Sequence, residues 1–368
     1  MSWELLNIIA VFVLSVFFTG ILIPQILLIS FRRNLFDVPD ERKIHRVVVP
    51  RLGGFAFVPV ICFSIALLLG TDYIAGRNMI LVQAGTLLLP LLFGFCSLLM
   101  LYLIGIADDL VGIRYRAKFV VQILCSVLMI VGGVWIDNLY GMLGIRALPE
   151  VVGYPLTILV IVFFVNAINL IDGIDGLASG LSSVAMTIYG TFFLLHENYV
   201  YALVAFSTLG VLVPFFYYNV FGNAERHRKI FMGDTGSLTI GLVIGILSIE
   251  LLKYGAVANE PNRVMALAFT PMIIPCLDVI RVFFVRLRQH RNPFLPDKTH
   301  IHHKLLALGL PQWVALITIL MVSVAYTAVN ILLSPYMDIT LLAMLDIVVW
   351  FAGNAALSYR IRAINERK

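Results

Sequence analysis

The chain contains 368 residues, of which 61% are hydrophobic and only 13% are charged, and its mean hydropathy is +0.97. A soluble domain is about half apolar and about a quarter charged, so this composition excludes an ordinary soluble globular protein. The formal net charge is +5. The sequence lacks the interleaved basic and aromatic residues of nucleic-acid-binding proteins, and we expect no nucleic-acid partner.

Long apolar segments follow one another along most of the chain. Eleven of them approach the length of about 20 helical residues that crosses a hydrocarbon core of about 30 Å. They lie near residues 5–30, 53–71, 83–106, 119–136, 154–171, 176–195, 199–219, 236–252, 264–285, 313–333 and 337–357. Only helices and closed barrels satisfy the backbone in lipid, and these segments lack the alternation of barrel strands. We therefore predict an all-α, polytopic integral membrane protein that forms one domain over residues 1–368 and has the lipid bilayer as its solvent.

Basic residues are distributed unevenly over the connections between these segments. Of the 26 Lys and Arg residues, all but Arg77, Arg146, Lys253 and Arg263 fall on one predicted face of the membrane. Short connections rich in Lys and Arg stay in the cytoplasm. We therefore expect the N-terminus outside and the C-terminus in the cytoplasm.

Acidic residues and histidines also collect on the predicted cytoplasmic face, where the charge rule for loops does not require them. Every histidine except His196 falls there, and so do the adjacent carboxylates Asp108 and Asp109. Two like charges in a poorly solvated place bind a cation or shift a pKa. The pair therefore indicates a divalent metal or a proton-transfer role, with a solvated helix end as the alternative.

Four polar residues recur at every third position in one short stretch. They are Asn166, Asn169, Asp172 and Asp175. On a regular helix each step of three residues drifts by about 60°, but a break at Gly173 or Gly176 can turn the acids back toward one site. With Asp234 from another connection, these oxygen atoms suit Mg²⁺. The alternative is a polar hairpin that caps two helices.

A histidine-rich segment lies near the end of the predicted cytoplasmic connections. It contains His300, His302 and His303, with Lys304 following directly and Arg286, Arg288 and Lys298 nearby. This surplus of cations favours phosphate binding. A zinc site, for which the chain offers no thiolate partner, and plain loop structure remain as alternatives.

Acids for a divalent ion, cations for phosphate oxygens and an apolar scaffold together indicate phosphoryl transfer between a soluble and a lipid substrate. Such a reaction requires little beyond in-line positioning and charge neutralisation. A membrane hydrolase of a lipid diphosphate could use a similar site with water as the acceptor. A transporter is less well supported, because its site would lie near the bilayer midplane.

Four motifs in order resemble one family of membrane enzymes. They are Asp108-Asp109, Asn166-x-x-Asn169-x-x-Asp172-Gly-x-Asp175-Gly-Leu-Ala, Phe231-Met-Gly-Asp-x-Gly-Ser237 and His300-Ile-His-His303. Together they resemble the polyprenyl-phosphate N-acetylhexosamine-1-phosphate transferases over about residues 37–310. The resemblance is closest to the bacterial branch that makes undecaprenyl-diphospho-GlcNAc for O-antigen, enterobacterial common antigen or teichoic acid linkage units. The sequence Pro50-Arg51-Leu-Gly-Gly54 differs from the Thr-Pro-rich loop of the muropeptide-transferring relatives and argues against their substrate.

The resemblance also implies partners and residue roles. It implies Mg²⁺, for which Mn²⁺ can substitute, a UDP-N-acetylhexosamine donor, an undecaprenyl phosphate acceptor, the bacterial inner membrane and, by analogy, a homodimer. Asp108 would be the base that deprotonates the lipid phosphate, with Asp109 beside it, and Asp234 and Asn169 would bind the metal. Lys118 would meet the diphosphate, and Asp175 and Phe231 would lie near the uracil. The substrate-binding positions implied in all are Lys118, Asp172, Asp175, Phe231, Arg286, Arg288, His300, His302, His303, His45 and Arg51.

Overall fold

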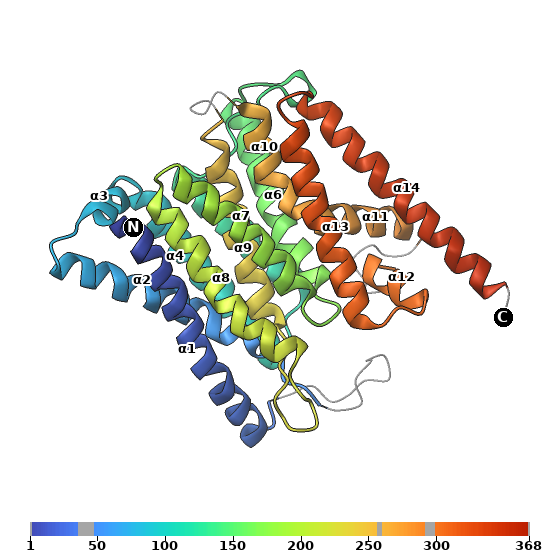
Figure 1. Cartoon of the computed structure of the whole chain (residues 1–368), viewed down its shortest axis with the longest axis horizontal. Helices are drawn as coiled ribbons and strands as arrows, with labels where there is room; N and C mark the ends of the chain where they lie inside the picture. Colours follow the sequence, from blue (N-terminus) through green and yellow to red (C-terminus); the bar gives the residue numbers. More distant parts are fainter. Residues whose placement is uncertain (1, 36–47, 256–259, 291–298, 367–368) are drawn as a thin grey trace.

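The computed structural model describes residues 2–35, 48–255, 260–290 and 299–366. Helices make up most of this part of the chain (Figure 1), and the described residues form no β-strand beyond one isolated bridge between Asn138 and Ala147. The α-helices are α1 (Trp3–Arg33), α2 (Phe57–Ile74), α3 (Met79–Thr86), α4 (Leu88–Val111), α5 (Tyr115–Val131), α6 (Glu150–Ile171), α7 (Leu177–Leu195), α8 (Tyr199–Val220), α9 (Gly233–Leu252), α10 (Pro261–Phe269), α11 (Ile273–Arg288), α12 (Ile301–Ala307), α13 (Gln312–Leu333) and α14 (Ile339–Asn365). Short 3₁₀ turns are η1 (Gly53–Ala56), η2 (Met142–Gly144) and η3 (Thr270–Met272). The predicted all-α class is confirmed.

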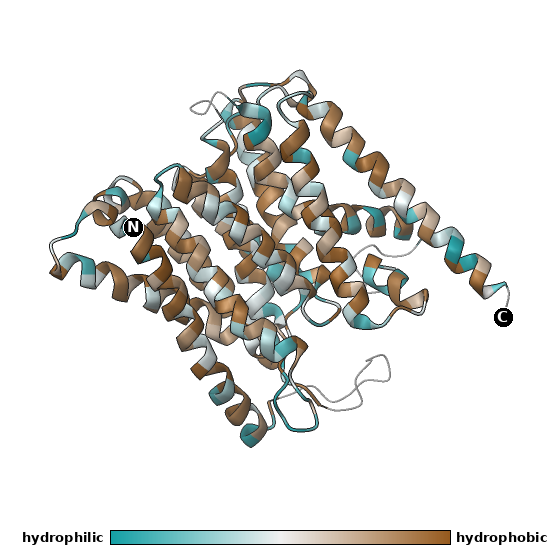
Figure 2. Cartoon of the chain, in the orientation of Figure 1, coloured by the Kyte–Doolittle hydropathy of each residue, from teal (hydrophilic) through white to brown (hydrophobic). Residues whose placement is uncertain are grey.

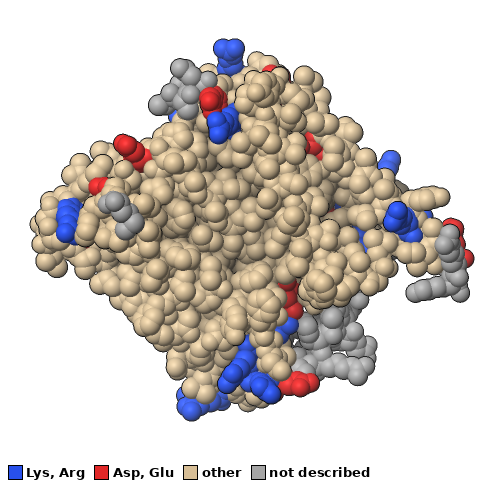
Figure 3. Space-filling view, in the orientation of Figure 1, with Lys and Arg blue, Asp and Glu red and all other residues tan. Residues whose placement is uncertain are grey.

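The outer surface of the helices suits lipid. Apolar residues run along the helix shafts, and polar residues gather at the helix ends and in the connections (Figure 2). Figure 3 shows a broad central surface without charged atoms, with Lys, Arg, Asp and Glu at its margins. Among the described residues, ten helical segments are long and apolar enough to cross a membrane. The protein is therefore a polytopic membrane protein.

The predicted fourth span, 119–136, differs from what the structure contains. Helix α5 has 17 residues and ends at Val131, because Gly132 and Gly133 follow and Gly133 has a φ of +86°. Helix α5 nevertheless runs the length of α9. Its first turn carries Lys118, whose Nζ lies 2.5 Å from Asp234 Oδ2 at the start of α9, and Lys253 Nζ at the end of α9 donates to Gly133 O at 3.1 Å. The two ends of α5 thus lie at opposite faces of the protein.

Helix α9 is the centre of the structure. All but a few of its residues are buried, and α4, α6, α7 and α10 pack around it. Glycines allow two of these close approaches, since a Cβ on Gly105 of α4 would overlap the backbone of Thr235, and one on Gly241 would overlap Val165 of α6. Small residues at such crossings are typical of helix packing in membranes, where van der Waals contact replaces the hydrophobic effect.

The helix ends divide between two faces. The end of α4, the beginning of α5, the end of α6 and the beginning of α9 meet at one face through Asp108, Lys118, Asn169 and Asp234. The beginning of α1 lies beside α3, away from this cluster (Figure 1). Which face is cytoplasmic, and hence where each terminus lies, remains a prediction from the distribution of Lys and Arg.

We predict that Gly105→Ala destabilises the protein, because the new methyl group would force α4 away from α9. Overpacking of this kind costs about 1–3 kcal/mol. The midpoint of thermal unfolding in detergent would measure the loss. The matched control is Gly94→Ala in the same helix, where the new methyl group would meet the Met129 side chain at 3.8 Å, an ordinary contact. Equal unfolding midpoints for the two variants would contradict the role given to Gly105.

Candidate active site

Three helices bring Asp108, Asp234 and Lys118 together at the beginning of α9. Lys118 Nζ lies 3.2 Å from Asp108 Oδ2 and 2.5 Å from Asp234 Oδ2, so one ammonium group joins the two acids. Asn169 Nδ2 donates to Asp234 Oδ1 at 3.1 Å and to Ser237 Oγ at 2.9 Å. The side chains of Lys118, Asp108 and Asp234 keep 20%, 15% and 24% of their surface exposed. They are therefore accessible to a ligand.

The adjacent acids Asp108 and Asp109 have different surroundings. Asp108 Oδ1 accepts the Ile113 N–H at 2.6 Å, where Gly112 ends α4 with a φ of +72°. Asp109 instead caps α9: its Oδ1 accepts the Asp234 N–H at 2.8 Å, and its Oδ2 accepts the Thr235 N–H at 2.9 Å and the Thr235 hydroxyl at 2.6 Å. The first N–H groups of a helix have no partner within it. Asp109 thus supplies from α4 the cap that the sequence of α9 lacks.

A second contact fixes the loop that precedes Asp234. Phe231 N donates to Pro50 O at 2.8 Å, Gly53 N to Phe231 O at 2.9 Å, and Gly54 N to Met232 O at 2.9 Å. A side chain on Gly54 would collide with the backbone of α9, which explains the glycine. The Arg51–Gly54 segment and the Phe231–Asp234 segment, distant in sequence, therefore form one structural unit.

The predicted break between Gly173 and Gly176 is confirmed. Helix α6 ends at Ile171, and α7 begins after Gly176, whose φ is +79°. Asn219 holds this hairpin, since its Oδ1 accepts the Gly176 N–H at 2.6 Å and its Nδ2 donates to Ile230 O at 2.8 Å. The hairpin therefore has a fixed place beside the Phe231–Asp234 segment.

The residues spaced by three do not form one cluster. Asn169 reaches Asp234, whereas Asn166 Nδ2 donates to Gln122 Oε1 at 2.6 Å, and Asp175 Oδ2 pairs with Lys229 Nζ at 2.6 Å. The drift of about 60° per step explains the divergence of Asn166. In the described part of the chain, no three His, Cys, Asp or Glu residues form a metal-binding group. The oxygen atoms that converge on one cation are those of Asp108 and Asp234.

Asp172 follows the last residue of α6 and is partly exposed. Burial raises the pKa of its carboxyl group to about 7, and the nearby charges of Asp175 and Asp234 act in the same direction, whereas Arg51 opposes them. Arg51 therefore lies close enough to Asp172 for its charge to lower the pKa of that carboxyl group.

The histidine-rich segment is anchored by a buried acid of α11. Asp278 is fully buried; its Oδ1 accepts from Arg281 at 2.8 Å and from the Ile301 N–H at 3.1 Å, and its Oδ2 accepts the His300 Nδ1 proton at 2.8 Å. Arg281 also donates to Thr299 O at 2.5 Å. One carboxylate thus fixes the backbone and the first imidazole of this segment.

His302 lies between the anchored segment and the hairpin. It is fully buried, and neither ring nitrogen has a hydrogen-bond partner among the described residues. A side chain on Gly173 would collide with its ring, so the imidazole lies directly against the hairpin backbone. Burial, with the charges of His303 and His300, lowers the pKa of His302 to about 3, which makes it a neutral ring.

The remaining predicted site residues fall in different surroundings. Arg286 is buried and Arg288 is exposed at the end of α11, and Lys304 donates to Asn354 Oδ1 and Ser358 Oγ of α14. Burial lowers the pKa of Lys304 to about 8. His45 lies outside the described residues. The roles assigned to these residues from the sequence remain predictions.

Sequence reasoning gave no role to several residues that hold the site together, among them Asp278, Lys229 and Asn219. Asp278 precedes Arg281 by three residues, which is one helical turn, and this spacing of opposite charges beside an apolar helix was the available signal. Lys229 and Asn219 have no comparable local signal, because their partners Asp175 and Gly176 lie far away in sequence.

The chain is similar to known membrane enzymes over most of its length. The sequence model of glycosyl transferase family 4 matches residues 90–252, which include Asp108, Lys118, Asn169 and Asp234. A Salmonella typhi protein named undecaprenyl-phosphate alpha-N-acetylglucosaminyl 1-phosphate transferase is 30% identical over 325 residues, covering 86% of this chain and 82% of the relative.

Two further relatives extend the comparison. A Bacillus subtilis (strain 168) protein named "Probable undecaprenyl-phosphate N-acetylglucosaminyl 1-phosphate transferase" is 28% identical over 336 residues, covering 90% of this chain and 86% of the relative. An Escherichia coli (strain K12) protein with the same name as the Salmonella typhi protein is 27% identical over 301 residues, covering 81% of this chain and 76% of the relative. The chain belongs to glycosyl transferase family 4, which confirms the resemblance carried by its motifs.

We predict that Asp278→Asn lowers the thermal stability of the protein, because Arg281 would remain buried without its counter-charge. Removing one partner of a buried ion pair costs about 3–5 kcal/mol. Thermal unfolding would report this loss, and limited proteolysis would report release of residues 299–301 from α11. The control is Asp137→Asn, a change at an exposed acid. Unchanged unfolding and proteolysis in Asp278→Asn would show that the anchor is dispensable.

We also predict that the effect of Asp172→Asn on stability depends on pH. The folded carboxyl group keeps its proton up to about pH 7, whereas the unfolded one ionises near its ordinary pKa of 3.8, so the wild type loses stability as pH rises between these values. Asn cannot ionise. The free energy of unfolding of the variant should therefore exceed that of the wild type at pH 8 by about 1–2 kcal/mol after allowance for partial exposure, and the excess should shrink toward pH 5. Measurements with EDTA and without nucleotide test this, and a pH-independent difference would count against it.

Proposed function

We propose that this chain transfers a sugar 1-phosphate, with GlcNAc as the sugar, from a UDP-sugar to undecaprenyl phosphate. The products are UMP and a polyprenyl-diphospho-sugar that begins the synthesis of a cell-surface glycan. The observation that carries the proposal is the pair of carboxylates, Asp108 and Asp234, joined by Lys118 at the ends of membrane helices. The names of the relatives supply the substrates.

The site lies where a soluble and a membrane-bound substrate can meet. Lys118 and its two acids lie at helix ends of one face, and the lipid-compatible shafts of α4 and α5 lead directly to them. The polyprenyl tail can therefore stay in the bilayer while its phosphate reaches the acids. We infer that this face is cytoplasmic, in a bacterial inner membrane, because most Lys and Arg residues belong to connections on that side.

The reaction exchanges one phosphorus–oxygen bond for another. An oxygen of the lipid phosphate attacks the phosphorus that carries the sugar, a new P–O–P bond forms, and the bond to UMP breaks, with UMP leaving as the phosphate anion. No redox change occurs. Because both reactants are anionic, catalysis requires neutralisation of charge on the transferred group and alignment of attacking and leaving oxygens.

A divalent cation fits the donor set of the site. Oxygens of Asp108 and Asp234 converge on one ammonium group, which shows that a cation can occupy the space between them. Mg²⁺ is usually held by one or two carboxylates with waters and substrate phosphates, so a larger group of acids is not required. We propose that Asp234 and Asn169 hold Mg²⁺, with Mn²⁺ able to replace it; the Asn169 amide, whose nitrogen donates to Asp234, would turn its oxygen to the ion. When bound, the ion would neutralise the charge of the diphosphate.

The chain's own residues would prepare the acceptor and position the donor. Asp108 is partly exposed and would accept a proton from the lipid phosphate, which leaves a better nucleophile. Lys118 would turn from the acids toward the diphosphate. The contacts of Asp109 support a positioning role beside its predicted place in catalysis, because it orients the first turn of α9 that carries Asp234.

The nucleotide would lie along the hairpin and the Phe231–Asp234 segment. Asp175 and Phe231 would contact the uracil, and Lys229, paired with Asp175, lies at the same place. The histidine-rich segment would close the other side, since His302 contacts the hairpin. Roles for Asp172, Arg51, Arg286, Arg288 and His45 in substrate binding are part of the same proposal, as is a homodimer inferred by analogy.

We predict that purified protein releases UMP from UDP-GlcNAc only when both undecaprenyl phosphate and Mg²⁺ are present. Asp108→Asn should lower the rate by about 10²–10⁴-fold, the contribution of a general base, and leave the unfolding midpoint nearly unchanged. Asp109→Asn should lower both the rate and the unfolding midpoint, because α9 loses its cap.

The controls separate the alternatives. Asp234→Asn should abolish lipid-dependent release, whereas Asp137→Asn, at the exposed far face, should behave as the wild type. Release of UMP without the lipid would instead indicate a hydrolase. No release from any UDP-N-acetylhexosamine would contradict the proposed transfer.

A further inference from the structure

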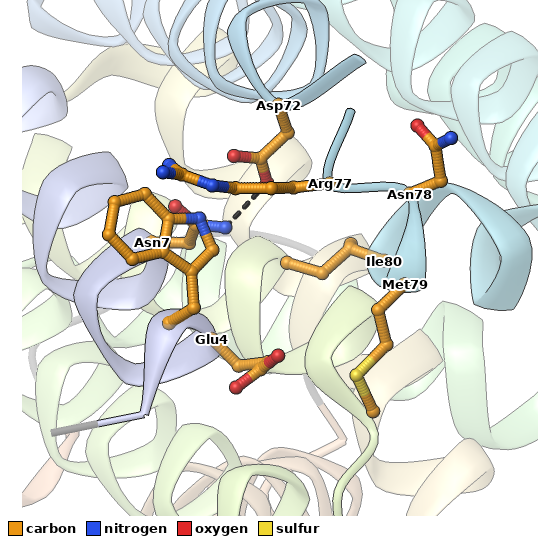
Figure 4. Close-up of a pocket in the computed structure, with 8 residues that line it drawn as sticks. Glu4, Asn7, Asp72, Arg77, Asn78, Met79 and Ile80 are labelled. Carbon is orange, nitrogen blue, oxygen red and sulfur yellow. Dashed lines mark hydrogen bonds between the residues drawn. The ribbon is translucent and has the colours of Figure 1, made fainter. Parts of the chain in front are cut away.

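A cavity of about 430 Å³ lies beside the beginning of α1 and the end of α2, away from the acid cluster. The residues around it are Trp3, Glu4 and Asn7 of α1, Asp72 of α2, Arg77 in the turn between α2 and α3, and Met79 of α3 (Figure 4). Its volume lies in the range of small-molecule sites, about 300–1,000 Å³. None of these residues belongs to the site described above.

Asp72 is a buried carboxylate that lacks a counter-charge. It is 5% exposed, and Asn7 Nδ2 donates to its Oδ2 at 2.5 Å. In the described part of the chain, no Lys, Arg or His forms an ion pair with it. A buried charge of this kind is costly unless a cation or several donors compensate it. A positively charged group bound in the cavity would therefore compensate the charge of the Asp72 carboxylate.

Arg77 carries a positive charge in the same cavity but does not supply that group. Its guanidinium lies over the Trp3 ring, 3.3 Å from the ring centroid, and it forms no ion pair with a described residue. The turn explains this direction, because Arg77 N donates to Asp72 O at 2.9 Å and the side chain extends toward α1. In Figure 4 the Arg77 side chain passes below Asp72, with Glu4 farther below. The guanidinium is thus available to an anion.

The rim of the cavity is apolar and lipid-facing. Among the residues that line the cavity, Trp3 and Met79 are 39% and 53% exposed, and Tyr73 and Ile74, which follow Asp72 in α2, are 70% and 86% exposed. Residues with such exposure in a membrane protein contact lipid, and Trp3 is of the type enriched at the membrane–water interface. A ligand that reaches the cavity from this rim must have an apolar part beside a charged part.

We propose that this cavity binds the headgroup of a phospholipid that carries a primary ammonium group and a phosphodiester. The ammonium group would donate to Asp72 and Glu4, and the phosphate would pair with the Arg77 guanidinium, a charge-assisted contact that is often bidentate. A trimethylammonium headgroup cannot donate hydrogen bonds to Asp72. A headgroup with an anion alone would meet two carboxylates without compensation. The ethanolamine headgroup offers one ammonium group for the two carboxylates to share and one phosphate for Arg77.

The test measures bound lipid directly and does not depend on enzymatic activity. Protein is reconstituted in nanodiscs with equal amounts of phosphatidylethanolamine, phosphatidylcholine and phosphatidylglycerol, extracted in mild detergent, and examined by native mass spectrometry. We expect the wild type to retain phosphatidylethanolamine about tenfold over phosphatidylcholine, the ratio given by one charge-assisted hydrogen bond. Asp72→Asn should abolish this preference, whereas Arg77→Gln should lower the retention of both lipids, because both carry the phosphate that Arg77 would bind.

Matched variants keep the test conclusive. Arg146→Gln removes an exposed arginine outside the cavity and should retain the preference of the wild type. Glu4→Gln changes a less buried residue and serves if Asp72→Asn unfolds. Equal retention of the two lipids by the wild type, or undiminished retention of both lipids by Arg77→Gln, would overturn the proposal. Retention of water-soluble glycerophosphoethanolamine but not of the lipid would overturn the lipid assignment.

Discussion

The hydrogen bonds from the first turn of α9 to Asp109 are the interaction on which the site depends. Helix α9 is buried along its length, so the N–H groups at its beginning cannot all turn to water. Asp109 accepts two of them from a neighbouring helix and thereby fixes α9 against α4. Because Asp234 belongs to that same turn, the contact that satisfies the helix also determines where the carboxylate points. Stability and chemistry are linked at this position.

In the other parts of the site as well, polar groups form hydrogen bonds with the backbone and thereby fix the position of each segment. The Pro50–Gly54 segment pairs with Phe231 and Met232, Asn219 holds the hairpin, and Asp278 holds the histidine-rich segment. Each anchor lies beside a residue proposed to contact substrate. The partly exposed side chains of Asp108 and Lys118 therefore project from a backbone that these anchors hold in place.

Much of this arrangement could be predicted from sequence, and the exceptions have physical causes. Apolar length predicted the helices, and the motifs predicted which of their ends meet, because each motif follows or begins an apolar segment. The extent of α5 was predicted wrongly from its apolar run, which continues to Ile136, although Gly132 and Gly133 signal the end of the helix. The different surroundings of Asp108 and Asp109 could not be predicted. Two adjacent identical residues acquire different surroundings only through their partners, such as Ile113 and Thr235.

The shortness of α5 has a consequence for the surrounding membrane. Its 17 residues rise about 26 Å, less than a hydrocarbon core of about 30 Å. Val120, Ile123 and Val131 are more than 40% exposed, so this short helix faces lipid. Hydrophobic mismatch of this kind is relieved by local thinning of the bilayer. The phosphate of a polyprenyl phosphate beside α5 would then lie nearer the bilayer midplane than the headgroups of other lipids, at the depth of Asp108 and Lys118. Local thinning of the bilayer would thus bring the acceptor to the site.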